Sequence, residues 1–169
     1  DAYAAAELAA HVNAMATFPT LLTGALLPAL RRGGPGLVVN MGSFADDGLP
    51  YLPTYGPAKG FLMASTRGLA REMACEGRDV EVLGLRVGLV CGTALNDRPP
   101  SLFAPDARVF VRAALARVGC GRMVIGPYWP HALQMALVGL LPAFLSEAFV
   151  ARELKGRMLA ERAKMAKDH

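Results

Sequence analysis

Tyr55 and Lys59 are the residues whose types and spacing most directly indicate chemistry, because they form a Tyr-x-x-x-Lys pair. If both lie on one helix, a spacing of four residues puts their side chains on the same face, one turn apart. An isolated phenol has a pKa of about 10 and exchanges protons poorly near neutral pH, whereas a neighbouring ammonium favours the phenolate and lowers that pKa. The pair therefore indicates general acid–base chemistry.

Two polar residues upstream give this pair a context. Ser43 lies twelve residues before Tyr55 and directly follows a short apolar run, and Asn13 lies thirty residues before Ser43 in a stretch with helical periodicity. A Tyr-x-x-x-Lys pair arises easily by chance in a chain of this size, so the surrounding elements have to support it. We therefore treat Asn13, Ser43, Tyr55 and Lys59 as candidates for a single site.

The first 90 residues are predicted to alternate between helices and buried strands. The predicted elements are a long helix over 4–31, a strand over 37–41, a helix from 56 to about 75 and a strand over 79–90. The long helix is expected to kink near Pro19 and to end with Pro28 and the glycines that follow it. Continuous apolar strands that alternate with helices are typical of a parallel sheet in an α/β fold with right-handed crossovers.

The remaining residues have a different character. A proline-rich loop over 96–106 and a helix over 106–118 are predicted to precede an apolar stretch over 132–150 and a basic tail. We therefore divide the chain into a catalytic part, 1–125, and a C-terminal part, 126–169, which holds the apolar stretch and is a candidate for association with a membrane.

Charge and cysteine content exclude several classes of protein. The 18 basic and 14 acidic residues leave a net charge of +4, and most of this excess lies in residues 151–169, so the nearly neutral body argues against nucleic-acid binding. The three cysteines and three histidines lack the paired spacings of disulfide frameworks and metal sites. They are Cys75, Cys91, Cys120, His11, His131 and His169. We expect buried, reduced thiols, a cytosol-facing protein and no metal.

Several stretches of this sequence resemble the short-chain dehydrogenase/reductases. Around the candidate site they are Val39-Asn40-Met41-Gly42-Ser43-Phe44 and Thr54-Tyr55-Gly56-Pro57-Ala58-Lys59. Later in the chain they are Phe103-Ala104-Pro105-Asp106, Phe110-Val111, Gly119 and Pro127-Tyr128-Trp129-Pro130-His131. The later stretches resemble one branch in particular, the fungal-type very-long-chain 3-oxoacyl-CoA reductases. The resemblance extends from about residue 8 to residue 165.

The resemblance implies a role for each candidate residue. Tyr55 is expected to protonate the carbonyl oxygen of the substrate and to contact the cofactor. Lys59 is expected to support Tyr55 and hold the nicotinamide ribose, and Ser43 to bind the substrate oxygen. Asn13 is expected at the kink of its helix, where a freed backbone carbonyl holds a relay water, and in contact with the cofactor site. The segment after the second strand is expected to contact the nicotinamide amide through Val90, Gly92 and Thr93. The implied cofactor is NADPH.

The implied fold is the C-terminal portion of a Rossmann-like doubly wound parallel sheet. No G-x-G-x-x-G or G-x-x-x-G-x-G turn follows a strand in this sequence, so the N-terminal Gly-rich βαβ unit that would bind the pyrophosphate is missing. We therefore expect the chain to be the C-terminal half to two-thirds of an enzyme. Two smaller departures are a Ser43–Tyr55 spacing one residue shorter than is common and Val87-Gly88 in place of Pro-Gly.

The function implied by the resemblance is NADPH-dependent reduction of a very-long-chain 3-oxoacyl-CoA to the 3-hydroxyacyl-CoA in fatty-acid elongation. A 17β-type hydroxysteroid dehydrogenase and a truncated, non-catalytic interaction module are the alternatives. Besides the acyl-CoA, the expected partners are membrane lipid and other elongation enzymes.

The stretch 132–150 is open to three interpretations: a soluble helix over the substrate pocket, an interfacial or re-entrant helix, and a membrane span. The basic residues that follow it favour the cytosolic side and anionic lipid. With the resemblance, this implies docking on the endoplasmic-reticulum membrane with the catalytic part facing the cytosol, whereas Lys164 and Lys167 only partly resemble a dilysine retrieval signal.

Overall fold

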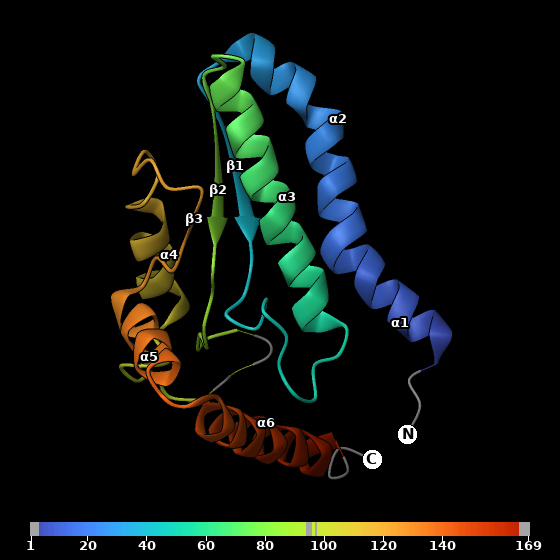
Figure 1. Ribbon diagram of the computed structural model, residues 1–169, viewed down its shortest axis with the longest axis vertical. Helices are drawn as coiled ribbons and strands as arrows, with labels where there is room; N and C mark the ends of the chain where they lie inside the picture. Colours follow the sequence, from blue (N-terminus) through green and yellow to red (C-terminus); the bar gives the residue numbers. More distant parts are fainter. Residues whose placement is uncertain (1–3, 94–95, 97, 166–169) are drawn as a thin grey trace.

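A three-stranded parallel sheet organises the protein (Figure 1). The structure is a computed structural model, and it describes residues 4–93, 96 and 98–165. Strand β1 (Gly36–Met41) pairs along its whole length with β2 (Val80–Leu85), from Gly36 opposite Val80 to Met41 opposite Leu85, and β2 also pairs with the short β3 (Val124–Ile125). The parallel α/β architecture predicted from the sequence is confirmed.

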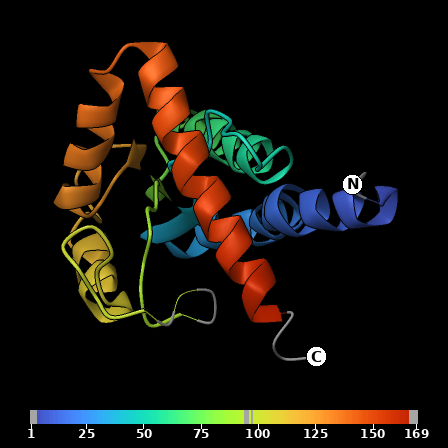
Figure 2. The same cartoon turned by 90° about the horizontal axis from the view of Figure 1, so that it is seen from below.

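Helices cover both faces of this sheet. In chain order they are α1 (Ala5–Val12), the π-helical turn η1 (Asn13–Thr17), α2 (Phe18–Gly33), α3 (Tyr55–Cys75), α4 (Ala107–Leu115), α5 (Trp129–Gly139) and α6 (Ala143–Met165). Helices α2 and α3 lie on one face, and α4 lies on the other with α5 beside it (Figure 1). Helix α6 runs across the carboxyl ends of the strands, as the view from below shows (Figure 2).

Strand β2 is the centre of the core because both of its faces are covered. Val80 and Val82 pack with Met73 of α3 and with apolar residues of α2, whereas Leu83 and Leu85 pack against α4. Alternate side chains of a strand point to opposite faces, so a strand covered on both sides has to be apolar throughout. This explains the continuous apolar run of this segment.

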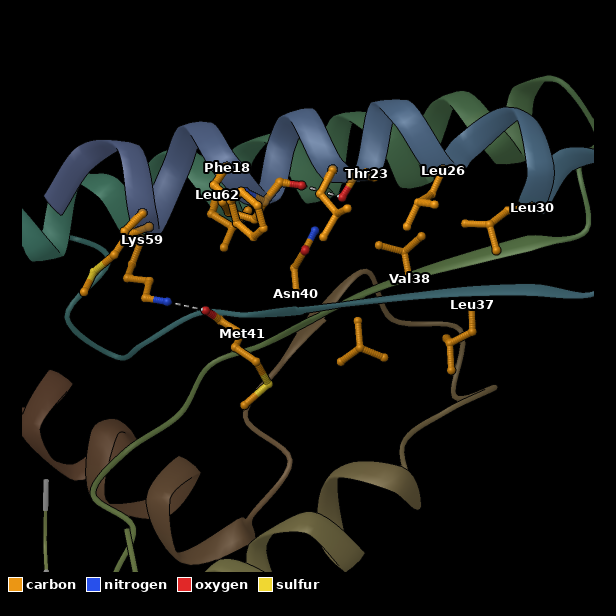
Figure 3. Close-up of a pocket in the computed structure, with 15 residues that line it drawn as sticks. Phe18, Thr23, Leu26, Leu30, Leu37, Val38, Asn40, Met41, Lys59 and Leu62 are labelled. Carbon is orange, nitrogen blue, oxygen red and sulfur yellow. Dashed lines mark hydrogen bonds between the residues drawn. The ribbon is translucent and has the colours of Figure 1, made fainter. Parts of the chain in front are cut away.

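Strand β1, in contrast, is an edge strand of the described sheet. Its side chains Leu37, Val39 and Met41 are partly exposed, and a groove lies between the strand and α2 (Figure 3). On the α2 side the groove is lined by apolar residues that include Phe18, Leu22, Leu26 and Leu30. An unpaired edge next to an apolar groove is a surface on which another strand can pair.

The long N-terminal helix differs from the prediction in two details. Its interruption is the π-turn η1 that begins at Asn13, and Pro19 follows at the start of α2, where a missing N–H is tolerated. Pro28 does not end the helix, because α2 continues to Gly33. A proline within a helix removes one hydrogen-bond donor and need not stop the turns on either side.

The second half of the chain differs more from its predicted secondary structure. Strand β2 ends at Leu85 instead of residue 90, and β3 was not predicted, because two residues carry no detectable pattern. The stretch 132–150 is not one helix: α5 ends at Gly139 and α6 begins at Ala143, with Pro142 between them. A single membrane span over 132–150 is therefore wrong. The division of the chain at residues 125 and 126 falls directly after β3 and stays a prediction.

One helical stretch of the described residues, Ala5–Gly33, is long and apolar enough to cross a membrane by length and composition. Only 6% of its apolar window is buried in the structure, although α2 contacts β1 and α3.

The expectation that the cysteines are buried is wrong for two of the three. All three are free, but only Cys91 is buried, whereas Cys75 and Cys120 are exposed.

Candidate functional site

Tyr55 and Lys59 lie on the first two turns of α3, as predicted from their spacing. The Nζ atom of Lys59 donates a hydrogen bond of 2.8 Å to the carbonyl oxygen of Met41, at the end of β1 (Figure 3). The same nitrogen lies 5.9 Å from the centroid of the Tyr55 ring, within the range of a cation–π contact. Burial lowers the pKa of Lys59 below its usual value. The structure therefore holds a partly desolvated amine next to the phenol ring.

Ser43 lies just beyond the carboxyl end of β1. The backbone ladder continues past the strand, because the Gly42 N–H donates to Leu85 at 2.8 Å and the Phe44 N–H donates to Val87 at 3.2 Å. The hydroxyl oxygen of Ser43 accepts a hydrogen bond of 3.1 Å from the N–H of Ala45, which directs the start of the following turn. The segment 42–48, called the Ser43 loop below, is thus held at the carboxyl edge of the sheet.

Two glycines of α3 allow this loop to lie directly against the helix. A Cβ atom on Gly56 would lie 2.5 Å from the carbonyl oxygen of Ala45, and one on Gly60 would lie 2.5 Å from that of Asp46. No side chain fits at either position without displacing the loop backbone. The glycines therefore set the distance between the helix that carries Tyr55 and the loop that carries Ser43.

An ion pair fixes the other side of the Ser43 loop. The buried carboxylate of Asp46, with a side chain only 3% exposed, accepts hydrogen bonds from both Nε and an Nη of Arg86, which directly follows β2. Arg86 also donates to the exposed Asp47 at 2.8 Å. The hydrogen bond to Asp46 is the main reason why the pKa of Arg86 is raised. The sequence analysis missed this pair, since no local pattern links residues forty positions apart.

Ser43 and Tyr55 line one cavity of about 540 Å³. Its walls come from the Ser43 loop, the segments 87–89 and 101–104, α5 and α6, which passes over this end of the molecule in Figure 2. Most of the lining is apolar: Phe44, Ala45, Leu49, Leu52, Val87, Leu89, Phe103, Ala104, Met135, Val138, Phe149, Val150 and Leu154. The polar side chains besides Ser43 and Tyr55 are Ser101, His131, Gln134 and Glu153. Such a cavity suits a large apolar ligand with a polar reacting end.

Lys59 faces a different space from Tyr55. It lines the groove between α2 and β1, together with Asn40 and Met41 (Figure 3). The groove and the cavity are thus both next to the start of α3, one on the Lys59 side and one on the Tyr55 side.

Asn13 lies where the kink was predicted, as the first residue of η1. Its side chain is exposed, and within the described residues no side-chain hydrogen bond joins it to Ser43, Tyr55 or Lys59. The carbonyl oxygen of Asn13 itself accepts the N–H of Phe18, and a freed carbonyl that holds a relay water at the kink stays a prediction. A π-turn moves that hydrogen bond one residue along the chain instead of leaving the acceptor unused.

Val90, Gly92 and Thr93 form a turn after β2. Val90 packs against the core around Leu83 and Leu85, and its carbonyl oxygen accepts a hydrogen bond of 3.2 Å from Asn96. Gly92 has a φ of +70°, which favours glycine, and the Thr93 N–H donates to the Asn96 carbonyl at 3.3 Å. The cavity is lined by the preceding residues, 87–89, so contact of Val90, Gly92 and Thr93 with a cofactor stays a prediction.

The described part of the chain contains no group of three or more His, Cys, Asp or Glu residues placed to hold a metal ion.

Comparison with known proteins agrees with this geometry. A family model described as short chain dehydrogenase matches residues 3–100. The chain is 32% identical over 127 residues to the very-long-chain 3-oxoacyl-CoA reductase of Pyricularia oryzae, which covers 72% of this chain and 37% of that protein. It is 34% identical over 147 residues to the reductase of the same name from Coprinopsis cinerea, covering 80% and 42% respectively. The chain therefore spans less than half the length of these two relatives.

Solved structures show the same fold. The short-chain dehydrogenase of Sphingobium yanoikuyae in complex with NADPH aligns with a TM-score of 0.60 at 22% identity, over 83% of this chain and 59% of that one. The bulky-bulky ketone specific alcohol dehydrogenase of Comamonas testosteroni aligns with a TM-score of 0.58 at 22% identity, over 83% and 56%. From the family match, the parallel sheet and the Tyr55–Lys59 pair beside Ser43, we conclude that the chain belongs to the short-chain dehydrogenase family.

Proposed function

We propose that the protein containing this chain reduces very-long-chain 3-oxoacyl-CoA to 3-hydroxyacyl-CoA with NADPH, as a step of fatty-acid elongation. The observation that carries the proposal is that Ser43 and Tyr55 line one large, mostly apolar cavity while Lys59 lies beside the Tyr55 ring. The names of the relatives cited above support the same substrate class.

The polar residues divide the work of this reaction between them. The Tyr55 hydroxyl gives its proton to the 3-oxo oxygen, and the Ser43 hydroxyl donates a hydrogen bond to the same oxygen while negative charge develops on it. Lys59, fixed by its bond to Met41, compensates the charge left on the phenolate. When bound, NADPH supplies the hydride that reaches the carbonyl carbon.

The residues present fit the nicotinamide end of such a cofactor. They lie at the carboxyl ends of parallel strands, which is where open α/β sheets bind nucleotides. Lys59 is half-buried there and offers donor hydrogens to ribose hydroxyls besides its bond to Met41. This sequence has no Gly-rich turn to bind the phosphates, so its residues fit only the nicotinamide end of the cofactor.

The cavity lining supports a long apolar substrate. Its far walls, on α5 and α6, are mainly apolar and include Met135, Val138 and Phe149. Burial of apolar surface contributes roughly 0.8 kcal/mol for each CH₂ group removed from water. A long acyl chain against these walls therefore adds binding free energy without contacting the reacting carbonyl.

We further propose that the protein lies on the endoplasmic-reticulum membrane, with this part facing the cytosol and with other elongation enzymes as partners. Large apolar side chains are exposed where α5 joins α6, with Leu140 at 81% and Phe144 at 70%. Arg152 and Lys155 are exposed on α6. An exposed apolar surface close to basic residues suits an anionic lipid surface, from which a long acyl chain could reach the cavity.

Kinetics with competing substrates test the reaction. The full-length protein is incubated with NADPH and either a series of 3-oxoacyl-CoA substrates of increasing chain length or a 17-ketosteroid. We expect kcat/KM to be higher for the acyl-CoA and to rise with chain length. A preference for the steroid would assign the protein to hydroxysteroid metabolism, and absence of turnover with both would favour the non-catalytic alternative.

A further inference from the structure

His131, near the start of α5, is a buried titratable residue that the proposed reaction does not use. It is only 1% exposed, and it lines the same cavity as Ser43 and Tyr55. Its ring contacts Phe44 and Tyr128 edge-on, with centroid separations of 6.3 and 5.0 Å. A polar ring buried this deeply among aromatic side chains requires a structural or functional explanation.

The contact of the ring with Phe103 indicates its tautomer. Nε2 lies 3.3 Å from the carbonyl oxygen of Phe103, and because a carbonyl oxygen only accepts, Nε2 carries the proton of the neutral ring. Burial lowers the pKa of His131, although the carbonyl oxygens of Phe103 and Leu89 oppose this effect. Nδ1 is buried and makes no hydrogen bond within the geometric limits among the described residues. His131 therefore holds the 101–104 segment through the contact of Nε2 with Phe103.

The ring also packs directly on the backbone of Gly88. A Cβ atom at this position would lie 2.8 Å from Cγ and from Nδ1 of His131, so the ring occupies the space that a side chain would need. Gly88, Phe103 and Phe44 belong to three separate segments, and all three line the cavity. Phe44 directly follows Ser43. One imidazole thus contacts three segments of the wall around the reacting end of the site.

We propose that His131 is a positioning residue, which holds the Ser43 loop, the 87–89 segment and the 101–104 segment in the arrangement that receives the substrate. The identity of the substrate rests on the proposed function, whereas the packing of the wall does not. No reacting atom is assigned to His131. Its loss is therefore expected to weaken substrate binding more than turnover.

Three variants of the full-length protein test this proposal. His131→Leu keeps an apolar side chain in the site but removes the donor, His131→Gln replaces the Nε2–H with an amide N–H, and His11→Leu alters an exposed histidine of α1 as a control. The loss of one hydrogen bond predicts a KM for the acyl-CoA raised about 2- to 12-fold in His131→Leu, with kcat and the NADPH dissociation constant changed less than about twofold. His131→Gln is expected to recover most of the KM, and His11→Leu to match wild type.

Amide hydrogen exchange adds a measurement that needs no substrate. We expect faster exchange over 87–91 and 101–104 in His131→Leu, unchanged exchange in α3, and near wild-type exchange in His131→Gln. If His131→Leu does not fold, Gly88→Ala displaces the same ring from the other side and is expected to raise KM in the same way.

Unchanged KM and exchange in the variants would overturn the proposal, and so would a loss of kcat at constant KM, because that would place His131 in the chemical step. If the wild-type protein reduces no 3-oxoacyl-CoA, the proposed function fails, and the exchange measurement still decides the role of His131.

Discussion

The Lys59 ammonium donates a hydrogen bond of 2.8 Å to the carbonyl oxygen of Met41, the last residue of β1. This bond joins the helix that carries Tyr55 to the strand that leads into Ser43. It also holds the long lysine side chain close to the Tyr55 ring, although lysine loses considerable rotamer freedom when it is fixed. The helix that carries Tyr55 and the sheet are therefore connected by Lys59, one of the candidate site residues.

Replacing Lys59 is expected to affect both tasks given to it. Lys59→Met keeps most of the apolar stem but removes the ammonium, so we expect slower turnover and weaker binding of the nicotinamide ribose. Stopped-flow kinetics and NADPH fluorescence titration of the full-length protein measure the two effects, each of which we expect to exceed about tenfold. A variant with wild-type turnover and wild-type NADPH affinity would show that the family role does not apply to this residue.

Alanine at two glycines of α3 is expected to have opposite effects on stability. Gly60→Ala would place a methyl group 2.5 Å from the carbonyl oxygen of Asp46, and we expect it to destabilise the fold by about 1–3 kcal/mol. Gly68 lies on the same helix, and a Cβ atom there would have no neighbour within 4 Å, so Gly68→Ala is expected to stabilise by about 0.5–1 kcal/mol. Urea unfolding measures the free energy of unfolding of both variants. Equal effects would contradict the direct contact of the Ser43 loop with α3 at Gly60.

The Asp46–Arg86 pair is expected to matter more than its exposed neighbour. Asp46→Asn removes the charge from a buried carboxylate with several hydrogen bonds, and we expect a loss of about 1.5–3 kcal/mol. Asp47→Asn is the matched control, because Asp47 is exposed and its bond to Arg86 should contribute at most about 1 kcal/mol. Chemical denaturation measures the free energy of unfolding of both variants. A larger loss in Asp47→Asn than in Asp46→Asn would be incompatible with the geometry of the pair.

The sequence predicts which elements carry Ser43, Tyr55 and Lys59 better than it predicts the second half of the fold. Tyr55 and Lys59 follow from a local rule, the i, i+4 spacing on a helix, and Ser43 from the end of an apolar strand. The contacts of Arg86 with Asp46 and of His131 with Gly88 depend on how distant segments pack, which hydrophobic periodicity does not encode. These are the residues that the sequence analysis did not identify as parts of the site.

The difference between local sequence patterns and contacts of distant segments also explains the errors in the predicted secondary structure. The apolar composition of 132–150 is as compatible with two helices as with one, and the break lies at Pro142, between α5 and α6. The strand β3 exists because Gly84 and Arg86 donate hydrogen bonds to Met123 and Ile125, and these bonds form only in the assembled sheet.

His131 also predicts a pH dependence of stability. Burial holds its pKa in the folded protein below the value of about 6.5 expected for the unfolded chain. Between these two pKa values the unfolded state binds more protons, so the free energy of unfolding falls as the pH falls from about 6.5 towards the folded pKa. Urea unfolding at several pH values measures this effect. As the pH falls, the free energy of unfolding should decrease more steeply for wild type than for His131→Gln. The same pH dependence in both proteins would contradict a neutral, buried ring.

The role of Tyr55 is the central claim, and Tyr55→Phe tests it most directly. The variant keeps the ring beside Lys59 but removes the hydroxyl that donates the proton, and general acid catalysis contributes roughly 10²–10⁴-fold to rate. We predict that the full-length variant keeps the circular dichroism spectrum of wild type while kcat for the 3-oxoacyl-CoA falls at least about 100-fold. A kcat above about a tenth of the wild-type value in a correctly folded variant would contradict the assignment of Tyr55 as the proton donor.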